Sequence, residues 1–72
     1  MPHIAVMMYP GRDEATKRKL AEALQKAAME SMGMPASALS VSVEDIEKER
    51  FDAVVAAKVD HDDLLIAPDF VK

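Results

Sequence analysis

The sequence predicts an α/β fold, in the wider sense of α+β, made of one strand–helix–strand unit with parallel strands. Three observations predict it: an apolar run over residues 3–9, a helical repeat over residues 13–32 and an apolar–polar alternation over residues 39–44. Strands joined through a helix within so short a stretch favour a right-handed parallel crossover. A shorter helix is expected to follow the second strand.

The first strand is expected from His3 to Tyr9, where nearly every residue is apolar on both alternating faces. This pattern is typical of a strand that is buried on both sides. Pro10 and Gly11 follow it directly, and both residues favour a turn. The strand is therefore expected to end there.

The long helix has the clearest signal in the chain. Gly33 and Pro35 mark its end, because glycine tolerates a left-handed backbone and proline cannot continue a helix. The residues that define its apolar face recur at helical spacing: Leu20, Ala23, Leu24, Ala27, Ala28 and Met32.

The second half of the chain predicts a strand and then a shorter helix. Residues 39–44 alternate, which indicates a strand with one apolar face. Residues 47–59 then favour a helix. The apolar run 64–66 before Pro68 fits a helix end, a short strand or a segment packed on a neighbouring subunit.

The chain has 72 residues, and we expect one domain covering residues 1–72. Half of the residues are hydrophobic, yet only one Tyr and two Phe are aromatic, so burial supplies limited area per residue. A lone monomer of this kind is marginally stable. Because the chain has no cysteine and no evident metal site, we expect a homo-oligomer that completes the sheet.

The charge pattern excludes some partners. The net charge is -4 and the basic residues are interleaved with acids, so no nucleic-acid surface is expected. No apolar run approaches the roughly 20 residues needed to cross a bilayer, and no signal peptide is evident. We expect a cytoplasmic protein without membrane association, in which one or two arginines can still bind an anionic ligand.

Pro2 is the candidate catalytic residue. Removal of Met1, the usual outcome ahead of a small residue, would leave a secondary amine on a rigid ring. A terminal amine titrates just above neutrality, and partial burial or a nearby cation brings it into the range where a general base works best. Without such a context, a proline at this position is usually incidental.

Four features, taken in order, resemble the 4-oxalocrotonate tautomerase family: Met-Pro-His-Ile at the start, Gly11-Arg12 before a long helix, Met34-Pro35 before the second strand, and Phe51 after it. The resemblance implies a cofactor-independent and metal-independent isomerase. By this resemblance, Pro2 would act as general base and then as general acid, and would move a proton between oxygen and carbon of a 2-hydroxydienoate or an enol.

The resemblance also assigns substrate-binding residues. Arg12 matches an arginine that binds the substrate carboxylate, and Phe51 matches an aromatic residue that lines and dries the pocket. Each also has an ordinary interpretation, Arg12 as a surface cation and Phe51 as a core residue. A metal site in the acidic stretch 60–63 is not expected, because consecutive residues rarely converge on one ion.

Ser40 departs from the pattern, because some family members carry a second arginine there. The sequence is closer to a phenylpyruvate-type bacterial branch, which has a similar tail to that over residues 66–70. This branch implies a substrate with one carboxylate and favours a dimer, with a hexamer built as a trimer of dimers as the alternative. Dehalogenase, hydratase or decarboxylase chemistry on the same proline remains open, as does a non-catalytic oligomeric binding module.

Overall fold

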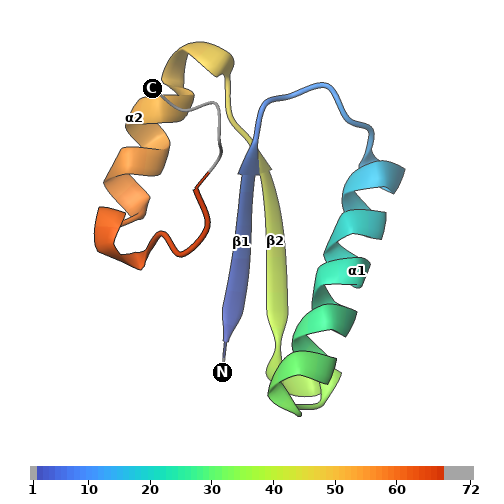
Figure 1. Ribbon diagram of the computed structural model, residues 1–72. Coiled ribbons are helices and arrows are strands. Elements are labelled where there is room, and N and C mark those ends of the chain that lie inside the picture. The colour runs from blue at the N-terminus through green and yellow to red at the C-terminus, as the bar shows by residue number, and fades with distance from the viewer. Residues whose placement is uncertain (1, 68–72) are drawn as a thin grey trace.

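The computed structural model describes residues 2–67 and confirms the predicted strand–helix–strand unit with a second helix after it (Figure 1). The 3-10 turns η1 and η2 follow α1 and α2, respectively. The elements in chain order are β1 (His3–Met8), α1 (Glu14–Met32), η1 (Ala36–Ala38), β2 (Ser40–Asp45), α2 (Lys48–Lys58) and η2 (His61–Asp63).

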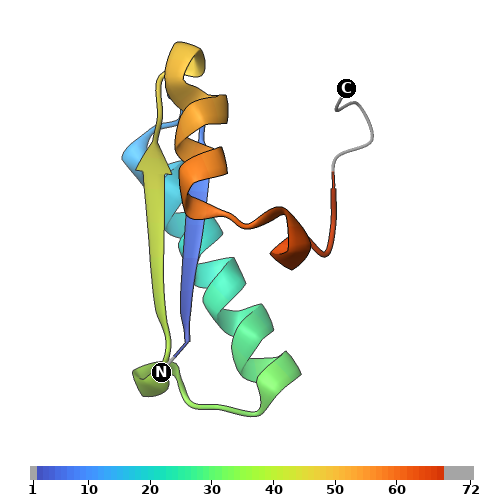
Figure 2. The ribbon, with the colours of Figure 1, turned by 90° about the vertical axis from the view of Figure 1, so that its left-hand side faces the viewer.

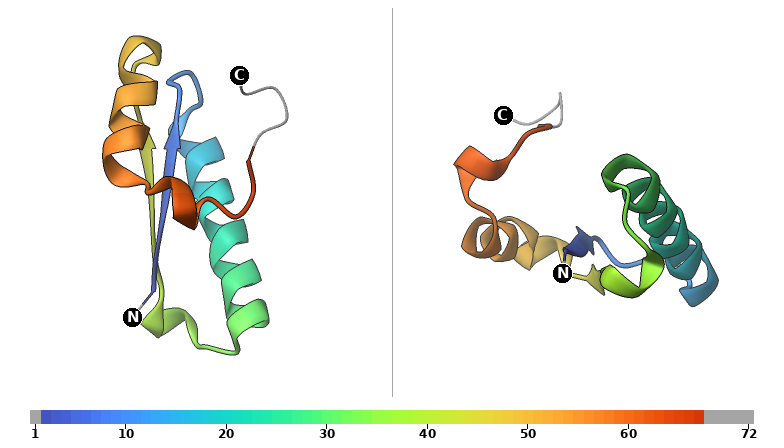
Figure 3. Two further views of the ribbon diagram at one scale, coloured as in Figure 1. Left: turned by 60° about the vertical axis from the view of Figure 1, so that its left-hand side comes forward. Right: turned by 90° about the horizontal axis from the view of Figure 1, so that it is seen from below.

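β1 and β2 pair in parallel, with His3 opposite Ser40 and Met8 opposite Asp45. The two helices lie on opposite sides of this strand pair, as Figure 1 and the view from below in Figure 3 both show. α1 packs along β2, while α2 lies on the other side, toward the carboxyl ends of the strands. The arrangement gives each end of the strand pair a different set of neighbours.

Both ends of α1 follow the sequence prediction closely. The Asp13 carboxylate accepts a hydrogen bond from the Thr16 backbone N–H at 2.8 Å, which caps the first turn. At the other end Gly33 adopts φ 63°, and its N–H donates to the Met29 carbonyl at 2.9 Å. Gly33 therefore ends the helix in the left-handed conformation expected of it.

The expectation that β1 is buried on both sides is wrong for the single chain. Ile4 and Val6 are half-buried, whereas His3 and Ala5 on the opposite face are exposed. The reason is that α1 covers only one face of a two-stranded sheet. Among the described residues only Leu39 and Ile46 are buried, and each keeps 5–7% of its surface exposed, so one chain closes a very small core.

The apolar run 64–66 after α2 forms neither a helix end nor a short strand. η2 is followed by irregular chain in which the side chains of Leu65 and Ile66 are 92% and 87% exposed. Figure 2 shows this segment leaving the body of the protein. The rest of the predicted tail motif, including Pro68, lies outside the described residues.

Candidate active site

Pro2 lies immediately before β1, at the amino end of the strand pair. Its side chain is half-buried, and its carbonyl accepts a hydrogen bond from the Ser40 N–H at 3.2 Å. The pairing of the two strands therefore extends one residue beyond β1 and fixes the backbone of Pro2. Met1, whose removal would free the Pro2 nitrogen, lies outside the described residues.

Three polar side chains surround the same end of the strands on the face away from α1. His3 Nδ1 lies 2.7 Å from Ser40 Oγ, and His3 Nε2 lies 3.0 Å from Ser42 Oγ. All three residues are exposed. The sequence alone does not assign a role to His3, because only the strand register places residue 3 beside residues 40 and 42.

The aromatic residues gather at the carboxyl end of the strands. Phe51, in the first turns of α2, packs against Tyr9, which directly follows β1. Their ring centroids are 4.9 Å apart and the planes cross at 82°, an edge-to-face pair. Phe51 is half-buried and Tyr9 is 46% exposed, so the pair forms part of the surface at this end.

Arg12 lies in the loop between β1 and α1, which leaves the same carboxyl end (Figure 1). Gly11 before it has φ 132°, a conformation that a residue with a Cβ rarely adopts. The Arg12 side chain is exposed and makes no hydrogen bond or ion pair with any residue in the range 2–67. Its five donors are therefore available to a carboxylate from outside the chain.

The predicted site residues thus fall into two groups at opposite ends of the sheet. Pro2 lies before β1, whereas Arg12 and Phe51 lie after the strands. A six-residue strand at about 3.3 Å per residue separates the two ends by about 20 Å. A single chain does not bring Pro2 together with either of the other two residues.

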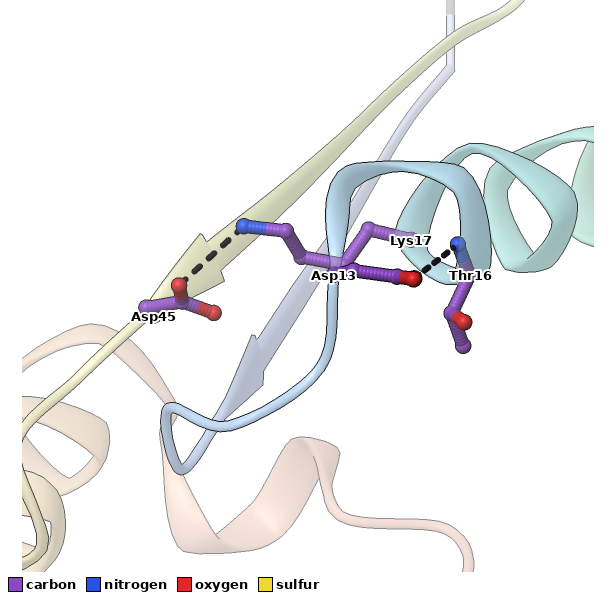
Figure 4. A network of polar contacts seen from close by, with 4 residues as sticks. All are labelled: Asp13, Thr16, Lys17 and Asp45. Carbon is purple, nitrogen blue, oxygen red and sulfur yellow. Dashed lines mark hydrogen bonds and ion pairs between the residues drawn. The ribbon is translucent and has the colours of Figure 1, made fainter.

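Charged side chains tie the carboxyl end of β2 to both helices. Lys17 of α1 lies 3.1 Å from the Asp45 carboxylate (Figure 4), and Lys58 of α2 lies 3.3 Å from the Glu44 carboxylate. In the loop before α1, hydrogen bonding from Thr16, first from its side chain and then from its backbone, lowers the pKa of Asp13. Asp13 is therefore a carboxylate at neutral pH.

The acidic stretch 60–63 forms η2 and its cap. His61 and Asp62 are 95% and 94% exposed, and the Asp60 carboxylate caps the turn by accepting from the Asp62 N–H at 2.9 Å. Within residues 2–67, no three His, Cys, Asp or Glu side chains are grouped as metal ligands. Over the same residues, neither helix has the length and apolarity needed to cross a bilayer.

The chain matches the family model described as "Tautomerase enzyme" over residues 2–58, from Pro2 to the last residue of α2. This match covers most of the sequence, and the chain belongs to the tautomerase family. A curated relative, a "Probable tautomerase" of Xylella fastidiosa (strain 9a5c), is 44% identical over 46 residues. These make up 64% of this chain and 56% of the relative, so the match spans about half of that protein.

Solved structures of the same family share the fold. TomN, a 4-oxalocrotonate tautomerase homologue of the tomaymycin biosynthetic pathway, has a TM-score of 0.66 and 40% identity over 69% of this chain and 77% of TomN. Unfused 4-OT in its apo form has a TM-score of 0.64 and is 31% identical, over 68% of this chain and 80% of the unfused 4-OT chain. N2, a member of the 4-oxalocrotonate tautomerase family, has a TM-score of 0.62 and is 28% identical, over 64% of this chain and 72% of the N2 chain.

Proposed function

We propose that this chain is a cofactor-independent enol–keto tautomerase that acts on a small 2-oxo acid through Pro2. The observation that carries the proposal is the hydrogen bond from the Ser40 N–H to the Pro2 carbonyl. This hydrogen bond holds the backbone of Pro2, which is the first residue of the match to the family model. A general base must be positioned as well as basic, and sheet pairing supplies the positioning.

The proposed reaction needs one proton carrier and no redox step. After Met1 is removed, the lone pair of the Pro2 nitrogen takes the proton from the 2-hydroxyl group of the enol. The oxygen electrons form the C=O bond, and the C=C electrons take a proton from the Pro2 ammonium at carbon. The amine is then free again, so atoms and charges balance over one turnover.

A second copy of the chain would complete the site. Arg12 and Phe51 are separated from Pro2 of their own chain by about 20 Å, the length of β1, far more than a small 2-oxo acid spans. Arg12 of one subunit, which is exposed and has no ion pair with residues 2–67, is suited to bind the carboxylate beside Pro2 of another. We therefore propose a homo-oligomer with shared sites, a dimer in preference to a trimer of dimers.

The substrate we propose carries a single carboxylate, such as an arylenolpyruvate, as in the phenylpyruvate-type branch. The residue paired with Pro2 is Ser40, whose hydroxyl is neutral. At the amino end of the strands, residues 2, 3, 40 and 42 include no arginine or lysine. One Arg12 per site therefore matches one carboxylate better than two.

The test is intact mass on fresh protein, followed by assays of ketonisation of phenylenolpyruvate and 2-hydroxymuconate. We expect loss of Met1, turnover that favours phenylenolpyruvate, and a loss of about 10²-fold or more in the Pro2→Ala variant. Pro35→Ala, at the exposed start of η1, is the matched control and should keep full activity.

Loss of Met1 without turnover of either enol would contradict the tautomerase. It would favour hydration-type chemistry on the same amine, or a non-catalytic module. A Pro2→Ala variant as active as the wild type would contradict Pro2 as the proton carrier.

A further inference from the structure

The loop that carries Arg12 has no hydrogen bond of its own to fix it. Residues 10–12 join β1 to α1 (Figure 1), and all three are exposed. None of them makes a hydrogen bond with another residue in the range 2–67. Gly11, at φ 132°, is also the residue type with the widest choice of other backbone conformations. The position of Arg12 therefore depends on how the two ends of this loop are held.

The α1 end of the loop is held by hydrogen bonds. The Asp13 carboxylate, directly after Arg12, accepts from the Thr16 N–H at 2.8 Å. The Asp13 carbonyl accepts from the Lys17 N–H at 3.1 Å. The Lys17 ammonium in turn lies 3.1 Å from the Asp45 carboxylate, which joins the first turn of α1 to the end of β2. The residue that follows Arg12 is therefore fixed relative to the strands.

The β1 end of the loop is held by an aromatic contact. The Met8 carbonyl accepts from the N–H of the buried Ile46 at 2.8 Å, which closes the pairing of the two strands. Tyr9 comes next, and its ring packs edge-to-face on Phe51 with centroids 4.9 Å apart. Phe51 lies in the first turns of α2, five residues after Ile46. Beyond the strands, the ring pair therefore holds the chain that leads into the Arg12 loop.

We propose that the Tyr9–Phe51 ring pair positions Arg12 for the substrate carboxylate, so that Tyr9 is a positioning residue that acts through the loop. This inference rests on the proposed function, in which Arg12 binds that carboxylate. Only two residues separate Tyr9 from Arg12, and the first of them, Pro10, has a fixed φ. A loop held at both ends loses less conformational freedom when its arginine binds, which favours affinity.

A positioning role for Tyr9 differs from two other roles that its ring could have. A ring that contacted the substrate itself would contribute to binding whether or not Arg12 is present. A ring that only packed on Phe51 would change stability and leave the kinetics alone. A ring that positions Arg12 lowers KM only as long as the guanidinium is there to be positioned.

The kinetic test uses Tyr9 variants in the intact protein with phenylenolpyruvate. Tyr9→Leu should raise KM by about 3- to 10-fold with little change in kcat, because the lost contact affects carboxylate binding. Tyr9→Phe keeps the ring and should keep the wild-type KM. In the Arg12→Ala background, Tyr9→Leu should cause no further loss of kcat/KM. Leu24→Ala, at a half-buried position of α1, is the control that lowers the melting temperature without raising KM.

Three results would overturn the positioning role. Additive losses of kcat/KM in Tyr9→Leu/Arg12→Ala would show that Tyr9 acts independently of Arg12. A lower melting temperature with an unchanged KM in Tyr9→Leu would make the ring pair a packing contact only. A loss in Tyr9→Phe equal to that in Tyr9→Leu would assign the effect to the hydroxyl group, not to the ring contact.

An NMR test needs no turnover. The backbone ¹H–¹⁵N heteronuclear NOE reports motion on the picosecond-to-nanosecond timescale. It should fall at Gly11 and Arg12 in Tyr9→Leu, stay at the wild-type value in Tyr9→Phe, and stay unchanged at Gly33, which ends α1 in all variants. Titration with phenylpyruvate should give a Kd about 3- to 10-fold weaker in Tyr9→Leu than in the wild type.

The NMR results also separate this inference from the proposed function. Unchanged NOE values at Gly11 and Arg12 in Tyr9→Leu would overturn the positioning role even if the enol assays show turnover. Lower NOE values with a weaker phenylpyruvate Kd, in a protein that turns over neither enol, would support the positioning of Arg12 while contradicting the tautomerase.

Discussion

The two ends of the strand pair carry different chemistry. At the amino end lie Pro2 and the polar side chains of His3 and Ser40. At the carboxyl end lie the Arg12 loop and the Phe51 ring, which packs on Tyr9. Under the proposed function, Pro2 at one end and Arg12 at the other would be two halves of a site that two chains complete.

The two ends also differ in how they are held. At the carboxyl end, ion pairs join Asp45 to Lys17 of α1 and Glu44 to Lys58 of α2. The contacts found at the amino end run from strand to strand, through the Pro2 carbonyl and the His3 ring. We infer that the carboxyl end is a preformed surface, whereas the amino end depends on strand pairing.

Replacing Arg12 should have the largest effect at the carboxyl end. Arg12→Ala removes charge-assisted hydrogen bonds to the carboxylate, so kcat/KM for phenylenolpyruvate should fall by roughly 10- to 100-fold, chiefly through KM. Arg12→Lys should recover only part of the lost kcat/KM, because lysine lacks the planar guanidinium group that binds both carboxylate oxygens. Arg18→Ala, an exposed arginine on α1, is the control. An unchanged KM in Arg12→Ala would contradict the role of Arg12.

The Tyr9–Phe51 pair should have an intermediate effect, and it separates packing from pocket lining. Phe51→Leu keeps the apolar bulk but removes the edge-to-face contact, which should reduce the free energy of unfolding by about 1 kcal/mol at fixed protein concentration. Tyr9→Leu should cost a similar amount, and the double variant little more. If Phe51 also lines the pocket, kcat/KM falls several-fold. A stability loss with unchanged kinetics would make Phe51 a packing residue only.

The smallest effect is expected at the cap of α1. The pKa of Asp13 is lowered because Thr16 hydrogen-bonds its carboxylate. The cap therefore stabilises the protein above the unfolded pKa of Asp13, and its contribution disappears as pH falls through the lower folded pKa.

Urea unfolding at several pH values checks this cap. Asp13→Ala should lower the urea midpoint at pH 7 by less than Phe51→Leu does, and the difference from wild type should vanish in acid. Asp52→Ala, an exposed aspartate on α2, is the control. A difference between Asp13→Ala and wild type that does not change with pH would contradict the carboxylate as the capping group.

The sequence was sufficient to predict elements whose signals are local. α1 was placed because its apolar residues recur at helical spacing and Gly33 and Pro35 mark its end, and β2 because its alternation is regular. The sequence did not predict what buries each face of β1, because an apolar pattern does not say whether an element of the same chain or a second chain packs against that face. The contacts of His3 join residues 37 and 39 positions apart, and they depend on a register that no local pattern specifies.

The most direct test of a shared site is subunit mixing. Pro2→Ala and Arg12→Ala proteins, each impaired in kcat/KM, are unfolded together in equal amounts, refolded and assayed with phenylenolpyruvate at concentrations well below the wild-type KM, where both parent proteins are slow. If Pro2 and Arg12 of one site come from different chains, random reassortment leaves about one quarter of the sites with both residues intact. We therefore predict recovery of about one quarter of wild-type activity, whereas a mixture that stays as inactive as its components would contradict the shared site.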